Sequence, residues 1–168
     1  MKRITFVAIV LGLTLSLGNT AFGQDNAKNR LGFFLAASSG DIDEIGLGGI
    51  GEFRIADKVT LSPQLILYFP EDRGGYDVNY FEINVNANYY FYNTDIFEFY
   101  GLGGLNLTRA HWDDDNGNDD SDTELGLNLG GGINFEIGKS FVPFSELRFT
   151  IGDYDQFVIS AGLKFNLK

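Results

Sequence analysis

A hydrophobic period of two runs from Arg30 to the end of the chain, and it constrains the fold more than any other feature. In the final segment, QFVISAGLKFNL, apolar residues hold the odd positions, and mostly polar or small residues hold the even ones. Because side chains alternate between the two faces of a strand, each such run predicts a strand with one apolar face. We predict eight strands: 30–38, 45–55, 59–69, 79–92, 96–109, 125–137, 140–151 and 156–167.

The two faces differ sharply in charge. If Arg109 at the edge of a loop is set aside, no odd position in these runs is charged. The even positions carry nine charges, which we predict to form a polar network inside a narrow barrel: Arg30, Glu52, Arg54, Glu82, Glu98, Glu136, Glu146, Arg148 and Lys164. Charges in such a lumen must pair or be hydrated. We expect Arg54 to pair with a carboxylate such as Glu52, Glu98 or Glu136.

The connections between the predicted strands alternate in length. Tight turns at 56–58, 93–95 and 138–139 alternate with longer loops, and these loops span 39–44, 70–78, 110–124 and 152–155. Short turns at one end and longer loops at the other predict an all-β fold, an eight-stranded antiparallel up-and-down transmembrane β-barrel. Aromatic residues near both ends of the apolar face resemble interfacial girdles. Because prolines cannot donate ladder hydrogen bonds, we expect bulges at Pro63 and Pro143.

A soluble lipocalin-like ligand-binding barrel is the competing fold, because it shares the period of two. Its polar face would meet water and be rich in Lys, Glu and Thr. The polar face here is mainly Gly, Asn and a few charges of both signs, which favours the membrane barrel. A formal charge of −11 argues against a nucleic-acid partner, and the absence of cysteine excludes disulfides and thiolate metal sites.

The N-terminal residues have the pattern of an export signal. Lys2 and Arg3 precede an apolar stretch, and the small residues Ala21 and Gly23 follow it. We therefore predict a cleaved signal peptide at 1–23 and a barrel domain at 24–168. The apolar stretch is too short for a comfortable membrane-spanning helix, which needs about 20 residues.

The pattern of the remaining chain resembles the small eight-stranded outer-membrane barrels, namely the OmpA transmembrane domain, the OmpX group and the outer membrane protein beta-barrel domain family. The resemblance implies a location in the bacterial outer membrane, contact with its lipid and lipopolysaccharide, and assembly by the barrel assembly machinery. The last strand resembles the signal that this machinery recognises, at Ser160, Gly162, Phe165 and Leu167. Lys168 departs from that pattern, because such proteins commonly end on an aromatic residue.

The third long loop is strongly acidic, with six aspartates between Asp113 and Asp122. It does not match an EF-hand, because Trp112 and Thr123 would stand where carboxylates are required. Mutual repulsion predicts an extended, mobile loop that a divalent cation would stabilise. We expect weak Ca²⁺ or Mg²⁺ binding at Asp113, Asp115, Asp119 and Asp120 and no other cofactor. The alternative is a solvated acidic loop that binds nothing.

We expect a non-enzymatic protein that acts in envelope integrity or in surface interaction through its acidic loops. A narrow ion channel is one alternative, and a plug of salt bridges is favoured over it because eight strands leave little internal space. A lipid A-modifying enzyme is another alternative. His111 is the only histidine, and Ser38 or Ser39 could approach it, but no spacing requires this.

Overall fold

The computed structural model describes residues 29–72, 76–114, 119–137 and 140–167, so the predicted signal peptide lies outside the described residues. The described part contains no helix that is long and apolar enough to cross a membrane. It consists of β1 (Arg30–Gly40), β2 (Ile45–Ala56), β3 (Val59–Tyr68), β4 (Glu71–Asp72), β5 (Tyr76–Asn93), β6 (Phe97–Asp114), β7 (Asp119–Phe135), β8 (Phe141–Gly152) and β9 (Gln156–Asn166).

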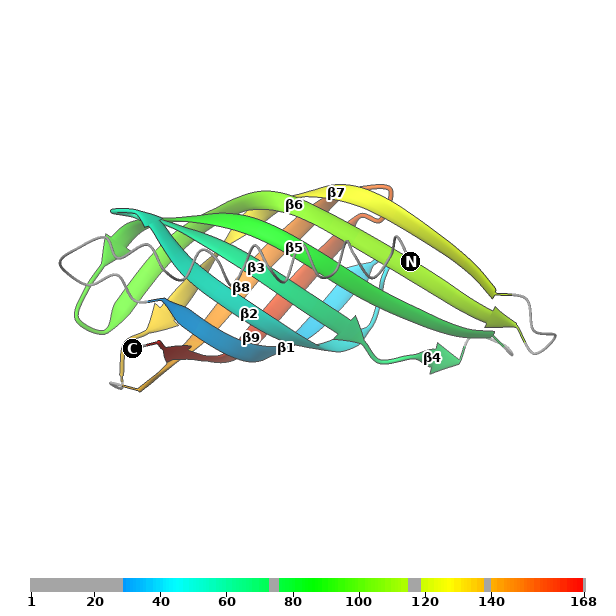
Figure 1. Ribbon diagram of the computed structural model, residues 1–168, viewed down its shortest axis with the longest axis horizontal. Helices are drawn as coiled ribbons and strands as arrows, with labels where there is room; N and C mark the ends of the chain where they lie inside the picture. The colour runs from blue at the N-terminus through cyan, green and yellow to red at the C-terminus, as the bar shows by residue number, and fades with distance from the viewer. Residues whose placement is uncertain (1–28, 73–75, 115–118, 138–139, 168) are drawn as a thin grey trace, which may run out of the picture.

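Eight of these strands close into a barrel (Figure 1). The sheet order is β3-β2-β1-β9-β8-β7-β6-β5, and pairing of β3 with β5 completes the ring. The two-residue β4 pairs with β5 outside this ring. All pairings are antiparallel, and β1 meets β9, with Arg30 opposite Asn166. The predicted eight-stranded antiparallel barrel is therefore confirmed, with both ends of the described chain on the side of the tight turns.

Side chains at odd-numbered positions of the strands face outward, and those at even-numbered positions face the lumen. Val85 is 43% exposed, whereas Asn84 and Asn86 on either side of it are fully buried. Among the described residues, all the large exposed apolar side chains except Tyr92 and Ile96 occupy odd positions. A continuous apolar surface of this extent would be unstable in water and is typical of a wall that faces lipid.

The largest departure from the predicted loops lies at the outer end of β5, β6 and β7. The sequence predicts a loop over 110–124, but the described residues of that segment are strand: Ala110 pairs with Asp122, and Asp113 pairs with Asp119. Ladder hydrogen bonds satisfy the backbone there, which favours a hairpin despite the like charges. Within the second predicted loop, β4 and the start of β5 also form strand. β7 thus extends beyond its last pair with β8, Gly126 with Gly152, by about 20 Å.

The expected bulges at the two prolines are wrong. The β3–β5 register runs unbroken through Pro63, and the β8–β9 register runs unbroken through Pro143. Opposite Pro63, the carbonyl of Gly51 receives a hydrogen bond from Ser62 Oγ at 3.1 Å, which replaces the missing proline N–H. Pro143 lies beyond the last residue of β8 that pairs with β7. The bulge that does occur between β2 and β3 lies at Arg54–Ala56, next to the turn.

Candidate functional site

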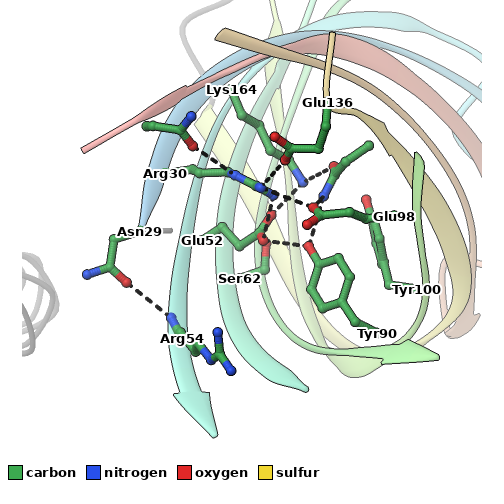
Figure 2. Close-up of polar contacts among 12 residues, drawn as sticks. Asn29, Arg30, Glu52, Arg54, Ser62, Tyr90, Glu98, Tyr100, Glu136 and Lys164 are labelled. Carbon is green, nitrogen blue, oxygen red and sulfur yellow. Dashed lines mark hydrogen bonds and ion pairs between the residues drawn. The ribbon is translucent and has the colours of Figure 1, made fainter. Parts of the chain in front are cut away.

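Arg30 organises an ion-pair cluster inside the barrel at the end with the tight turns (Figure 2). Its guanidinium lies 3.4 Å from Glu52, 3.0 Å from Glu98 and in contact with Glu136, and it donates to Asn166 Oδ1 at 3.2 Å. Three of these partners come from β2, β6 and β9, and Glu136 directly follows β7. Arg30 and Glu52 are each 2% exposed, so the cluster is largely withdrawn from bulk water.

Lys164 on the neighbouring strand β9 completes this cluster. Its Nζ lies 2.6 Å from Glu52 Oε2, donates to Asn134 Oδ1 at 3.0 Å, and lies 4.5 Å from the centre of the Phe144 ring. Tyr90 donates its hydroxyl hydrogen to Glu52 Oε1 at 2.5 Å. Glu52 therefore accepts from two cations and one phenol, as a fully buried carboxylate requires.

Arg54 does not join the cluster, so its expected pairing with a lumen carboxylate is wrong. Its guanidinium donates to the carbonyl of Ala56 and contacts Asp57 at 3.5 Å, and Figure 2 shows the side chain apart from the other charges. Arg54 lies next to the bulge and the exposed turn, where its long side chain reaches turn carbonyls and water instead. Arg30 and Lys164 pair with the lumen carboxylates instead.

A second charged cluster lies farther from the turns. Arg148 donates to Glu82 Oε2 at 2.7 Å and to Gln64 Oε1 at 3.1 Å, and Tyr68 donates to Glu82 Oε1 at 3.1 Å. Glu146 accepts from Gln64 Nε2 at 3.0 Å and from the hydroxyl of Tyr100 at 2.9 Å. The structure thus brings together the predicted residues Glu82, Glu146 and Arg148, in a group separate from Arg30 and Lys164.

Amide and hydroxyl side chains connect β5, β6, β7 and β8 across the lumen. Asn84 Oδ1 accepts from Asn106 and from Asn128, each at 2.8 Å, and Asn128 Oδ1 accepts from Thr150 at 2.9 Å. These contacts leave little room for a continuous aqueous pore in this part of the barrel.

An apolar cluster also occupies the lumen, and the sequence reasoning missed it. Its buried members are all at even positions: Phe34, Ala36, Ile42, Ile50, Ile66, Tyr68, Phe144 and Val158. Ile42 belongs to the first outer loop, which folds into the barrel mouth and is held there by Ser38 Oγ donating to the carbonyl of Ile42 at 2.7 Å. The sequence signal for this cluster was the presence of apolar residues at even positions, on the otherwise polar face. Tyr68, Tyr90 and Tyr100 also occupy even positions and indicate aromatic side chains inside the barrel.

Glycines on the inner face make room for the aromatic rings. A Cβ on Gly48 would overlap the Phe34 ring, and one on Gly132 would overlap the Tyr100 ring. Gly49 faces outward and has nothing within 4 Å of where a Cβ would lie. The glycine-rich even positions are thus part of the packing of the lumen.

At the turn end, a cavity of about 60 Å³ opens beside the Arg30 cluster. Its lining residues are Arg30, Glu52, Arg54, Ala56, Asp57, Lys58, Val59, Thr60, Tyr90, Asn93 and Glu98. The cations and carboxylates in this lining are equal in number, so the cavity does not select strongly for either sign of charge.

The remaining predicted sites are the assembly signal, on β9 and just after it, and the cation ligands. In the assembly signal, Ser160 is buried, Gly162 is partly buried, and Phe165 and Leu167 are exposed on the outer face. Of the predicted cation ligands, Asp115 lies outside the described residues, and the structure describes only the backbone of Asp113, Asp119 and Asp120. The same holds for His111, so no contact of its side chain with Ser38 or Ser39 is described. Elsewhere, in the described residues, no group of three His, Asp or Glu could hold a metal ion.

The chain matches a known family over nearly its whole length. The model of the family described as outer membrane protein beta-barrel domain matches residues 9–166. No curated protein sequence matches this chain significantly.

Solved structures with the same architecture are distant in sequence. Neisserial surface protein A is 18% identical, with a TM-score of 0.66 over 85% of this chain and all of that one. The N-terminal β-barrel domain of Pseudomonas aeruginosa OprF is 17% identical, with a TM-score of 0.66 over 84% of this chain and all of that one. Ail of Yersinia pestis, solved in complex with the heparin analogue sucrose octasulfate, is 15% identical, with a TM-score of 0.64 over 84% of this chain and 97% of that one.

Proposed function

This chain belongs to the outer membrane protein beta-barrel domain family, and from that premise we propose that it is a non-enzymatic outer-membrane barrel. Its proposed role is in envelope integrity and in surface interaction through its acidic outer segments. Export with cleavage of residues 1–23, and assembly through Ser160, Gly162, Phe165 and Leu167, belong to the same proposal.

The filled lumen is the observation that carries this proposal. Two charged clusters, the amide layer and the apolar cluster that contains Phe34 and Ile42 occupy the interior together. An ion crossing the barrel would have to break buried ion pairs and pass apolar side chains, each at a high cost in free energy. This supports a structural plug over the narrow channel.

The outer segments supply a mainly acidic surface. Asp41, Asp43, Asp122, Asp153 and Asp155 are exposed there. Such a surface repels polyanions and attracts cationic partners or cation-bridged ones. A sulfated ligand of the kind seen with Ail would therefore be disfavoured. We propose contact with anionic lipopolysaccharide through divalent cations.

The backbone register of the outer hairpin supports the cation proposal. The backbone register places Asp113 opposite both Asp77 and Asp119, and Trp112 opposite Asp120. Like charges directly opposite each other destabilise a sheet, and a Ca²⁺ or Mg²⁺ ion would relieve this repulsion. Weak binding, about 10⁻⁴–10⁻³ M, is proposed at Asp113, Asp115, Asp119 and Asp120. Saturable change in the fluorescence of Trp112 on Ca²⁺ titration supports it, and no change below about 10 mM contradicts it.

The decisive test compares the full chain with a variant in which residues 111–121 are replaced by a tight turn between Ala110 and Asp122. Both are expected to fold, as shown by heat-modifiable migration on SDS gels. In a deletion strain, only the full chain should restore resistance to detergent and adhesion to a surface. Both should give no unitary conductance in planar bilayers and no mass change in lipid A. A stable conductance would favour the channel, and a shifted lipid A mass would favour the enzyme.

A further inference from the structure

Three polar residues on the seam between β3 and β5 are buried without satisfying their hydrogen-bonding groups. Thr60 and Asn88 lie opposite each other in the register, and Asn86 is the next inward-facing residue on β5. Their exposed fractions are 6%, 1% and 0%. Within the described part of the chain, Thr60 Oγ1, both amide atoms of Asn88 and Nδ2 of Asn86 have no hydrogen-bond partner. Native proteins rarely bury such groups unpaired, so these atoms indicate a bound ligand.

The chemistry of the atoms decides the class of that ligand. Asn88 presents an unpaired donor and an unpaired acceptor, and exchanging its amide nitrogen and oxygen leaves this unchanged. A cation would satisfy the carbonyl oxygen of Asn88 but would be repelled by the N–H groups of Asn86 and Asn88. An anion would accept from those N–H groups but would be repelled by the carbonyl oxygen. Water both donates and accepts, so it matches all of these groups.

The cavity at the turn end provides the route to this seam. Thr60 lines that cavity, and its volume of about 60 Å³ has room for several water molecules. Farther toward the outer mouth, Asn86 Oδ1 is bonded to Asn128, and the apolar cluster with Ile42 follows. We propose that the turn end of the barrel is a blind, water-filled vestibule, which extends along Thr60, Asn88 and Asn86 and stops at the amide layer.

Side-chain amide exchange tests the hydration directly. In the folded protein in detergent micelles, water cross-peaks and rapid exchange into D₂O are expected for the Asn88 side-chain amide. The matched control is the amide of Asn128, which donates to Asn84 and Asn86 and should be protected in the same spectra. Equal protection of Asn88 and Asn128, with no water cross-peak at Asn88, would overturn the proposal.

Single-cysteine variants test whether access is one-sided, because the chain has no cysteine of its own. Thr60→Cys is expected to be blocked by Ag⁺ in the folded protein. Ala36→Cys, in the outer apolar cluster, should stay free until unfolding. Heat-modifiable migration confirms that each variant is folded. An unreactive Thr60→Cys, or equal reaction of the two variants, would refute a vestibule that opens only at the turn end.

Discussion

Replacing Lys164 by methionine should strongly destabilise the barrel, because it leaves the Arg30 cluster with three carboxylates and a single cation. Lys164 is fully buried and lies 2.6 Å from Glu52. Removing one partner of a buried ion pair costs about 3–5 kcal/mol. Arg30 and Tyr90 still contact Glu52, so we expect the lower part of that range.

The companion variants separate charge balance from packing. Glu52→Gln leaves Lys164 with Asn134 and two aromatic faces, and equalises the cations and carboxylates of the cluster. It should therefore cost less, about 1–3 kcal/mol. The double variant has the same balance of charges as the original cluster, so its loss should be smaller than that of Lys164→Met alone.

The assay is reversible urea unfolding in phosphocholine bilayers, followed by the fraction of heat-modifiable protein and extrapolated linearly to zero urea. A coupling energy of about 1–3 kcal/mol between positions 52 and 164 is expected. If Lys164→Met changes the free energy of unfolding by less than about 1 kcal/mol, or if the two single effects simply add, the cluster is hydrated and the reasoning fails.

Three further variants test other parts of the wall. Val85→Arg should cost about 2–4 kcal/mol in the same unfolding assay, because Val85 faces lipid, and a cost no larger than that of Val85→Leu would contradict this. Gly48→Ala should cost about 1–3 kcal/mol because the added methyl group would overlap the Phe34 ring, whereas the outward-facing Gly49→Ala should be neutral. Equal effects of the two variants would contradict the close packing of Phe34 on Gly48. Glu124 lies on the part of β7 that extends beyond its last pair with β8. A hydrogen bond with Asp153 is the main cause that raises the pKa of Glu124, so the folded state binds the carboxyl proton of Glu124 more tightly than the unfolded state does. The protonated carboxyl stabilises the fold at low pH, and this contribution is lost as the pH rises. Glu124→Gln should therefore raise the urea midpoint at pH 7 but not below about pH 4. A difference between the two proteins that does not depend on pH would contradict this prediction.

The sequence predicts the wall of the barrel well, because one face of each strand contacts lipid and the other face contacts the polar lumen. Lipid excludes charge from odd positions such as Val85, and a lumen accepts charge at even positions such as Glu82, so the alternation is preserved along every strand. The membership of the two charged clusters also follows from position along the strands, apart from Arg54. Its actual partner depends on the bulge at Arg54–Ala56, which local sequence does not specify.

The contents of the lumen and the outer hairpin were harder to predict, for physical reasons. Ile42 lies in a loop, and only the folded path of that loop brings it into the apolar cluster that contains Phe34. The hairpin residues are acidic, which predicts a solvated loop, but pairing across Asp113 and Asp119 satisfies the backbone and prevails. Both depend on contacts between segments that the period of two does not specify.

The meeting of β1 and β9 has a consequence for the order of folding. Arg30 and Asn166 are joined by a hydrogen bond across 136 residues, so the ring cannot close until nearly the entire chain has been made. Contacts this distant in sequence form slowly, and until they form β1 remains an open edge that can pair with other chains. Because Lys164 is on β9, the Arg30 cluster receives its second cation only at this step. Closure of the ring and pairing of Glu52 with Lys164 are therefore a single, late event in folding.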